Sequence, residues 1–288
     1  MDQANDFKQG DKGAWISIIT YIILAVVKLI IASVGHSDAL RADGLNNTTD
    51  VVASVAVLIG LKISRKPPDA DHRYGHHRAE TIASLFAAFV IVTVGIQVIT
   101  ESFENVLAGK TAQPGMLTGW TALGTAFLIY GVYLYNRRLA TKIGSSSLSA
   151  AAKDNRSDAF VSVGAFVGIS GAQFGIYWLD PLAGLIVGII ICKTAWDIFV
   201  DATHTLTDGF DETKIKQVKA GIADVTEVKK VVDVKGRIYG NQAFIDVTIL
   251  VEPSLNVKES HAITEKIERF LQDQYNIPYA QIHIEPYE

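Results

Sequence analysis

Long apolar runs separated by short polar stretches fill the first two thirds of the chain. A helix that crosses a membrane needs about 20 mostly apolar residues, and six windows have this length. The predicted spans are Ala14–Val34, Ala39–Ile63, Ala79–Glu101, Leu117–Tyr135, Ser147–Phe174 and Pro181–Thr203. The pattern therefore predicts an α-helical membrane domain with six transmembrane helices.

The second, third and fifth spans are less apolar than the others. The polar residues of the second and fifth are Asn46, Asp50, Asp154, Asn155, Arg156 and Asp158. A carboxylate at the bilayer centre costs about 2.5–3.5 kcal/mol on insertion scales, so such residues are expected to face inward and to mark a functional site. Hydropathy alone can miss a span of this kind.

From about Thr207 the pattern changes to that of a small soluble domain. DETKIKQVKAGIADV and VKESHAITEKIERFLQDQ have helical spacing, whereas KKVVDVKGRIYG, AFIDVTILVEP and YAQIHIEPY alternate like strands. The order αββαβ suits helices on one face of a three-stranded sheet, as in ferredoxin-like or metallochaperone-like modules. We expect a membrane domain at residues 1–206 and a cytoplasmic α+β domain at residues 207–288.

Composition supports this division and limits the partners. Hydrophobic residues make up 49% of the 288 residues and charged residues 19%, and the net charge of −4 gives no reason to expect nucleic acid. The single cysteine, Cys192, excludes a disulfide framework within one chain. Lysine and arginine concentrate in SRKPPDADHRYGHHR and NRRLATK, which places these loops, and both termini, in the cytoplasm. The expected location is a bacterial-type cell membrane.

Two pairs of polar residues carry the candidate chemistry. Asn46 and Asp50 are four residues apart, as are Asp154 and Asp158, so each pair lies on one helix face. Brought together, they supply one amide and three carboxylates, hard oxygen ligands that suit Mn²⁺, Mg²⁺ or Ca²⁺ better than zinc. Without a cation the carboxylates would repel one another and take up protons, so metal and protons should compete.

Neighbouring polar residues have less specific interpretations. Asp43 falls on nearly the same face as the second-span pair and is either an outer-shell or an entrance residue. Asn47 and Asn155 lie one position off the paired faces and are expected to pack helices. Lys28 in the first span either pairs with an acid or extends its amine toward the membrane surface. A purely structural role for all these groups is the alternative.

These motifs together resemble the cation diffusion facilitator family of metal transporters. The resemblance rests on ADGLNNTTD, DADHRYGHHRAE, DNRSD and the final IHIEP, in this order along nearly the whole chain. It implies six spans, a cytoplasmic αββαβ domain, a homodimer and proton-coupled export of a divalent cation, not an enzyme. It assigns the transport site to Asn46, Asp50, Asp154 and Asp158. One asparagine with three aspartates resembles the manganese-exporting branch, with Zn²⁺, Fe²⁺ and Co²⁺ as alternatives.

The same resemblance implies a second metal site and a charge interlock. Asp69, His72 and His76 match a loop site, whose two histidines at i and i+4 suit a borderline metal, although a solvated basic loop explains them equally well. The adjacent His77 has no assigned role. Arg78 with Asp208 matches an ion pair at the boundary between membrane and cytoplasm.

The soluble domain carries a weaker resemblance to a metal-sensing cluster. His261, His283 and Glu285 match or approach ligand positions, but Asp233 and Thr248 stand where zinc transporters commonly have histidine. Surface histidines with local partners are therefore the preferred interpretation.

Other classes of function remain to be separated. An intramembrane aspartyl protease also needs acids on two helices, but the chain lacks a G-x-G-D sequence. A channel or receptor would use the tail as a metal sensor and would not respond to a proton gradient. No phosphate-binding loop supports direct use of ATP.

Overall fold

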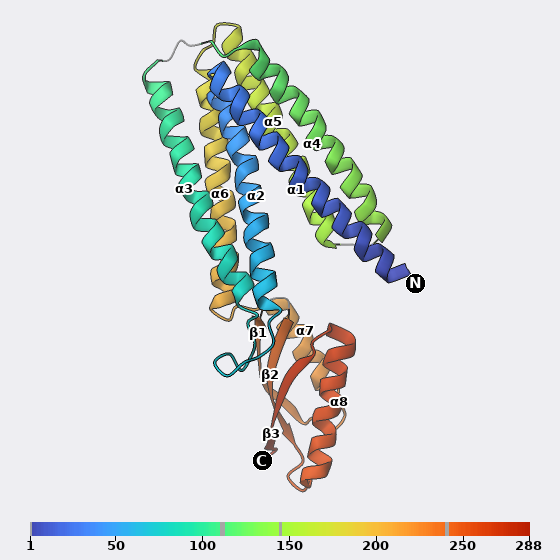
Figure 1. Cartoon of the computed structure of the whole chain (residues 1–288). Coiled ribbons are helices and arrows are strands. Elements are labelled where there is room, and N and C mark those ends of the chain that lie inside the picture. Colours follow the sequence, from blue (N-terminus) through green and yellow to red (C-terminus); the bar gives the residue numbers. More distant parts are fainter. Residues whose placement is uncertain (1, 110–112, 144–145, 240–241) are drawn as a thin grey trace. The chain divides into compact units, whose positions relative to one another are not determined.

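The computed structural model describes residues 2–109, 113–143, 146–239 and 242–288, which form eight helices and three strands (Figure 1). The six long helices are α1 (Asp2–Gly35), α2 (Asp38–Ser64), α3 (Ala79–Leu107), α4 (Met116–Ile143), α5 (Ser146–Gln173) and α6 (Leu179–Leu206). The elements that follow are α7 (Glu212–Ala223), β1 (Lys230–Tyr239), β2 (Gln242–Val251), α8 (Val257–Tyr275) and β3 (Tyr279–Pro286).

The chain forms two compact units. The first comprises residues 1–56 and 86–197, and the second comprises residues 57–85 and 198–288. The first unit contains most of the long helices, and the second contains the ends of α2, α3 and α6 together with the αββαβ elements. The predicted division at residue 206 stays a prediction.

Five of the long helices are long and apolar enough to cross a membrane. The exception in the described chain is α5, which is long enough but carries the polar sequence DNRSD. Large apolar side chains lie exposed on these helices, among them Trp120 and Phe127, as expected where helices face lipid. The predicted fold class, an α-helical membrane domain with a small α+β domain, is confirmed.

Helix ends differ from the predicted spans. The stretch NRRLATK, predicted as a basic loop, continues α4 to Ile143. Arginine, leucine, alanine and lysine are strong helix formers, so the helix extends past its apolar part. Likewise, α1 begins at Asp2 and α3 ends at Leu107. Charge marks where a helix leaves the apolar region, whereas helix propensity decides where it stops.

Close packing in the first unit uses small residues. A Cβ atom on Gly95 of α3 would lie 2.6 Å from Sγ of Cys192 on α6. Glycine therefore lets the two helices approach, a common device in membranes. The helices α1, α4 and α5 also run alongside one another (Figure 1).

The αββαβ elements form a three-stranded sheet with the order β1-β2-β3. Strand β2 pairs antiparallel with β1 and parallel with β3. Both helices lie on one face of the sheet and bury an apolar core that includes Val218, Ile267 and Ile249 (Figure 1). Asp211 caps α7, while Asn256 begins a capping box on α8, so both helices start with satisfied amides.

Candidate metal centre

The proposed transport residues lie on α2 and α5 in the first unit. Asn46 is buried, and its Nδ2 donates a hydrogen bond of 3.2 Å to Oδ1 of Asp158. The two helices are thus joined by one member of each predicted pair. This contact is the direct link between the two motifs that the sequence analysis singled out.

The other two members are placed differently. Asp50 has a buried carboxylate oxygen, Oδ2, with no hydrogen-bond partner among the described residues. Asp154 is exposed. Within the described chain, the three aspartates do not gather their ligand atoms within 4.8 Å of one another. The structure therefore brings Asn46 and Asp158 into contact, while Asp154 is exposed.

A buried lysine neighbours this set. Lys28 of α1 is fully buried, and its ammonium lies 2.9 Å from Oδ2 of Asp43. It also donates to Oδ1 of Asn47 at 2.7 Å and to Oγ of Ser162 at 3.0 Å. Of the two interpretations left open for Lys28, the structure selects pairing with an acid. Asp43 is accordingly the counterion of Lys28, and Asn47 packs helices through the same amine.

Sequence analysis missed a second contribution from α1. Oδ2 of Asp158 accepts a 2.5 Å hydrogen bond from the hydroxyl of Tyr21. That hydroxyl accepts a 2.7 Å bond from Nδ2 of Asn155, whose Oδ1 accepts from Asn136 of α4. A tyrosine in an apolar span gives no pattern that separates it from lipid-facing aromatics. Asn136 was not recognised as a membrane-domain residue because it begins NRRLATK, which was predicted to be a loop.

The loop site is the most compact ligand group in the described chain. Asp69, His72 and His76 place their donor atoms within 4.8 Å of one another. Asp69 lies 3.1 Å from Nδ1 of His72 and 3.4 Å from Nε2 of His76. The hydrogen bond from the backbone amide of His72 lowers the pKa of the Asp69 carboxyl. The donors are thus positioned to take a divalent ion, with the acid already charged.

The predicted tail residues have local partners. His261 lies 3.6 Å from Glu265 on its own helix, and His283 lies 3.4 Å from Glu285 on its own strand. In the described parts of the chain, the structure does not gather His261, His283 and Glu285 into one group of metal ligands. A hollow of about 230 Å³ on the strands includes His283 with Asp233 and Thr248.

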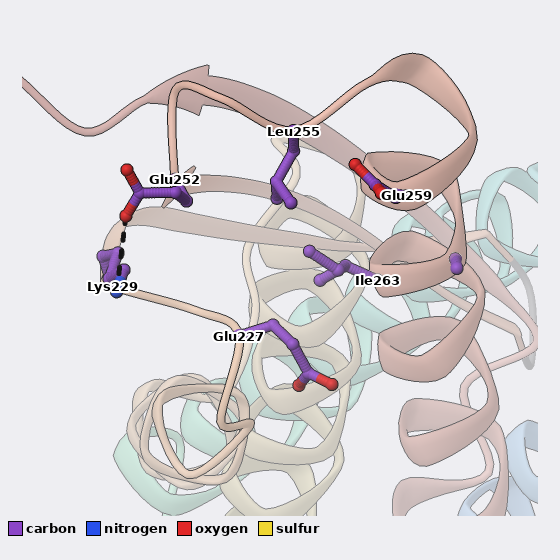
Figure 2. A pocket seen from close by; sticks show the side chains of 7 residues that line it. Glu227, Lys229, Glu252, Leu255, Glu259 and Ile263 are labelled. Carbon is purple, nitrogen blue, oxygen red and sulfur yellow. Dashed lines mark ion pairs between the residues drawn. The ribbon is translucent and has the colours of Figure 1, made fainter.

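A larger pocket of about 400 Å³ lies in the α+β domain, and Figure 2 shows the side chains that line it. Its lining consists of Glu227, Lys229, Glu252, Leu255, Glu259, Ala262 and Ile263. Lys229 pairs with Glu252 at 3.6 Å, and Glu259 belongs to the capping box of α8. A hydrogen bond from Lys266 lowers the pKa of Glu227. Each of these acids thus has a partner within the domain.

The residues of the predicted charge interlock are in contact. Arg78 donates from Nη2 to Oδ1 of Asp208 at 2.7 Å. The same guanidinium lies over the ring of Tyr239, 4.6 Å from its centroid. The pair is partly exposed, so the aromatic contact adds to a weak ion pair.

Comparison with known families covers both parts of the chain. The profile of the cation efflux transmembrane domain matches residues 14–207, and that of the cation efflux protein cytoplasmic domain matches residues 210–287. A solved chain of CzrB aligns with 28% of this chain and 100% of its own length, at 24% identity and a TM-score of 0.26.

Similar proteins from Bacillus subtilis align along their whole length. The manganese efflux system protein MneS is 50% identical over 288 residues, covering 100% of this chain and 99% of its own. The uncharacterized transporter YdbO is 50% identical over 286 residues, covering 99% of both chains. The matched family consists of transporters and not enzymes, which sets aside the intramembrane protease. The chain belongs to the cation diffusion facilitator family and is a membrane-spanning metal cation efflux transporter.

Proposed function

We propose that the protein exports Mn²⁺ from the cytoplasm in exchange for protons. The transport site comprises Asn46 and Asp50 of α2 with Asp154 and Asp158 of α5. The observation that carries the proposal is the contact between Asn46 and Asp158, because it joins two oxygen-bearing helix faces inside the bundle. The 50% identity to a manganese efflux protein supports the choice of ion.

Ligand chemistry favours manganese over zinc. The four side chains offer amide and carboxylate oxygens and lack the imidazole nitrogens and thiolates that suit zinc. If the three carboxylates came together around an ion, they would need positive charge, which either a divalent ion or protons supply. Because the metal ion and the protons compete for the same carboxylates, the binding of one releases the other, as exchange requires. Zn²⁺, Fe²⁺ and Co²⁺ are the alternative substrates.

Asn46 takes two roles in this scheme. Its Nδ2 donates to Asp158, so the amide oxygen is directed away from that carboxylate oxygen. A cation between the two residues takes oxygen from both, which requires the Asn46 amide to rotate about its terminal torsion. An ionised aspartate at this position could not donate to Asp158 and would repel it. Asparagine therefore suits a site that alternates between protons and metal.

The assembly and orientation are part of the proposal. Two copies form a homodimer through the cytoplasmic domain, with both termini in the cytoplasm. Arg78 and Asp208 connect the loop before α3 to the end of α6 within one chain. The exposed face of the sheet in the αββαβ domain is the surface available for the second copy.

Flux measurements in vesicles test the proposal. Purified protein is reconstituted, a pH gradient is imposed, and uptake of Mn²⁺, Zn²⁺, Fe²⁺ and Co²⁺ is compared. We expect Mn²⁺ to be preferred, its flux to follow the gradient, and Asp50→Ala or Asp158→Ala to abolish it. Asp197→Ala is the matched control, since this acid lies on a spanning helix and pairs with Lys193.

Two results would contradict the proposal. Wild-type flux in both Asp50→Ala and Asp158→Ala would remove the transport site from α2 and α5. Flux that ignores the pH gradient would identify a channel instead of an antiporter.

A further inference from the structure

Tyr21 is a buried tyrosine of α1 whose hydroxyl contacts the proposed transport site. It lies in a chain of side-chain hydrogen bonds that begins at Asn136 of α4, passes through Asn155 of α5 and ends at Asp158. All three residues before Asp158 are at most 8% exposed. Groups buried to this degree keep the hydrogen bonds they have, because water cannot replace them.

The direction of each bond follows from the first one. Nδ2 of Asn136 donates to Oδ1 of Asn155 at 3.0 Å and to Oγ of Ser17 at 2.9 Å. Because the Asn155 oxygen accepts, its Nδ2 is the atom that faces the hydroxyl of Tyr21, to which it donates at 2.7 Å. A phenol has one proton, and the remaining neighbour is the Asp158 carboxylate. Tyr21 is therefore fixed as a donor to Asp158.

The two oxygens of Asp158 then have different roles. Oδ2 is 2.5 Å from the Tyr21 hydroxyl, the short distance of a hydrogen bond to a charged acceptor. Oδ1 faces Asn46, the residue contributed by the other helix. A cation that used both oxygens would have to share Oδ2 with the Tyr21 hydroxyl, whose bond already takes one of the acceptor positions of that oxygen. A cation held by Oδ1 alone leaves that bond in place.

We propose that Tyr21 is a positioning residue of the transport site, which holds Oδ2 of Asp158 so that Oδ1 alone is presented to the metal. This inference rests on the proposed function, because it concerns a ligand of that site. Asn136 and Asn155 act through Tyr21 by fixing the direction of its proton. The expected consequence is weaker substrate binding without the hydroxyl, since Asp158 loses its orientation.

The test compares transport kinetics of Tyr21→Phe with those of the wild type in vesicles. We expect the KM for Mn²⁺ to rise about tenfold, which corresponds to about 1.4 kcal/mol, while the maximal rate stays within about twofold. Tyr133→Phe is the matched control, because it removes another buried tyrosine hydroxyl, one that accepts from Arg137. An equal KM in Tyr21→Phe and Tyr133→Phe would overturn the proposal.

A double-mutant cycle distinguishes positioning from general packing. Asn136→Leu removes the start of the hydrogen-bond chain with a side chain of the same heavy-atom number and branching, and should also raise the KM. In the Tyr21→Phe background the same substitution should add nothing, since its effect passes through the hydroxyl. If the two substitutions raise the KM additively, Asn136 acts separately from Tyr21, and the proposal that it acts through the Tyr21 hydroxyl is overturned.

Asp158→Ala in the same assay distinguishes failure of the proposed transport function from failure of the proposed role of Tyr21. If Asp158→Ala keeps wild-type flux, the proposed function itself fails. If Asp158→Ala abolishes flux but Tyr21→Phe leaves the KM unchanged, only the positioning role of Tyr21 fails. Direct titration of Mn²⁺ into the purified variants gives the same comparison without transport.

Discussion

Replacing Lys28 by methionine should strongly destabilise the membrane domain. Its ammonium and the Asp43 carboxylate are both fully buried and 2.9 Å apart. The same ammonium donates hydrogen bonds to Oδ1 of Asn47 and to Oγ of Ser162, so the buried charge has two neutral partners besides its counterion. Lys28→Met leaves the Asp43 charge buried and unpaired, and breaking a buried pair in this way costs about 3–5 kcal/mol.

The double variant Lys28→Met/Asp43→Asn should cost much less than the sum of the two single changes. Removing both charges ends the penalty for an unpaired buried ion, so replacement of a buried pair by neutral groups is often close to neutral. The lost bonds to Asn47 and Ser162 still cost about 0.6 kcal/mol each, the average for hydrogen bonds between membrane helices. The coupling energy between Lys28 and Asp43 should therefore reach at least about 2 kcal/mol.

The free energy of unfolding is measured in mixed micelles by the loss of helical circular dichroism. Lys193→Met is the matched control, because Lys193 pairs with Asp197 at 2.7 Å but is 74% exposed. Exposed pairs contribute about 0–1 kcal/mol. The reasoning is refuted if Lys28→Met costs no more than Lys193→Met, or if the two changes at the buried pair are additive.

Three further predictions concern the proposed sites. Asn46→His adds an imidazole ligand and should shift the ratio of Mn²⁺ to Zn²⁺ flux toward zinc; an unchanged ratio would argue against selection by ligand chemistry. Joint replacement of His72 and His76 by alanine should remove one bound divalent ion per chain, counted by metal analysis, with Mn²⁺ flux kept within a few fold. Equal metal content in variant and wild type would contradict this. Arg78→Ala should weaken dimerisation less than about fivefold in sedimentation experiments, because its bond to Asp208 is partly exposed and such pairs contribute about 1 kcal/mol or less; complete dissociation would disagree.

The sequence predicts most of the fold because two of its patterns are strong, the long apolar runs of the membrane domain and the alternation of apolar and polar residues in the tail. Runs of about 20 apolar residues have few alternatives to a membrane helix, and alternation in the tail fits the observed strands within one or two residues. Helix ends were less predictable, as the continuation of α4 to Ile143 demonstrates. Beyond the apolar part, stability depends on local helix propensity and packing, which hydropathy does not measure.

The candidate site was predictable only where spacing carries information. Asn46 and Asp158 belong to pairs four residues apart, so each was visible as part of a helix face before their contact was known. Tyr21 has no such pair, and its role depends on which helix lies beside it. Long-range packing of α1 against α5 decides this, and a single sequence does not report it.

Helix α1 contacts both helices that carry the proposed transport site. Tyr21 and Lys28 are seven residues apart, two helical turns, and therefore lie on one face of α1. Tyr21 bonds only to α5 residues among its described partners, whereas Lys28 bonds to Asp43 on α2 and to Ser162 on α5. If α2 and α5 separate to admit an ion, Lys28 cannot keep both. The ion pair with Asp43 is stronger than the bond to the Ser162 hydroxyl, but the Tyr21 hydroxyl also attaches α1 to α5 through a charge-assisted bond. If the proposed site opens between α2 and α5, Lys28 would have to give up either its ion pair with Asp43 or its bond to Ser162.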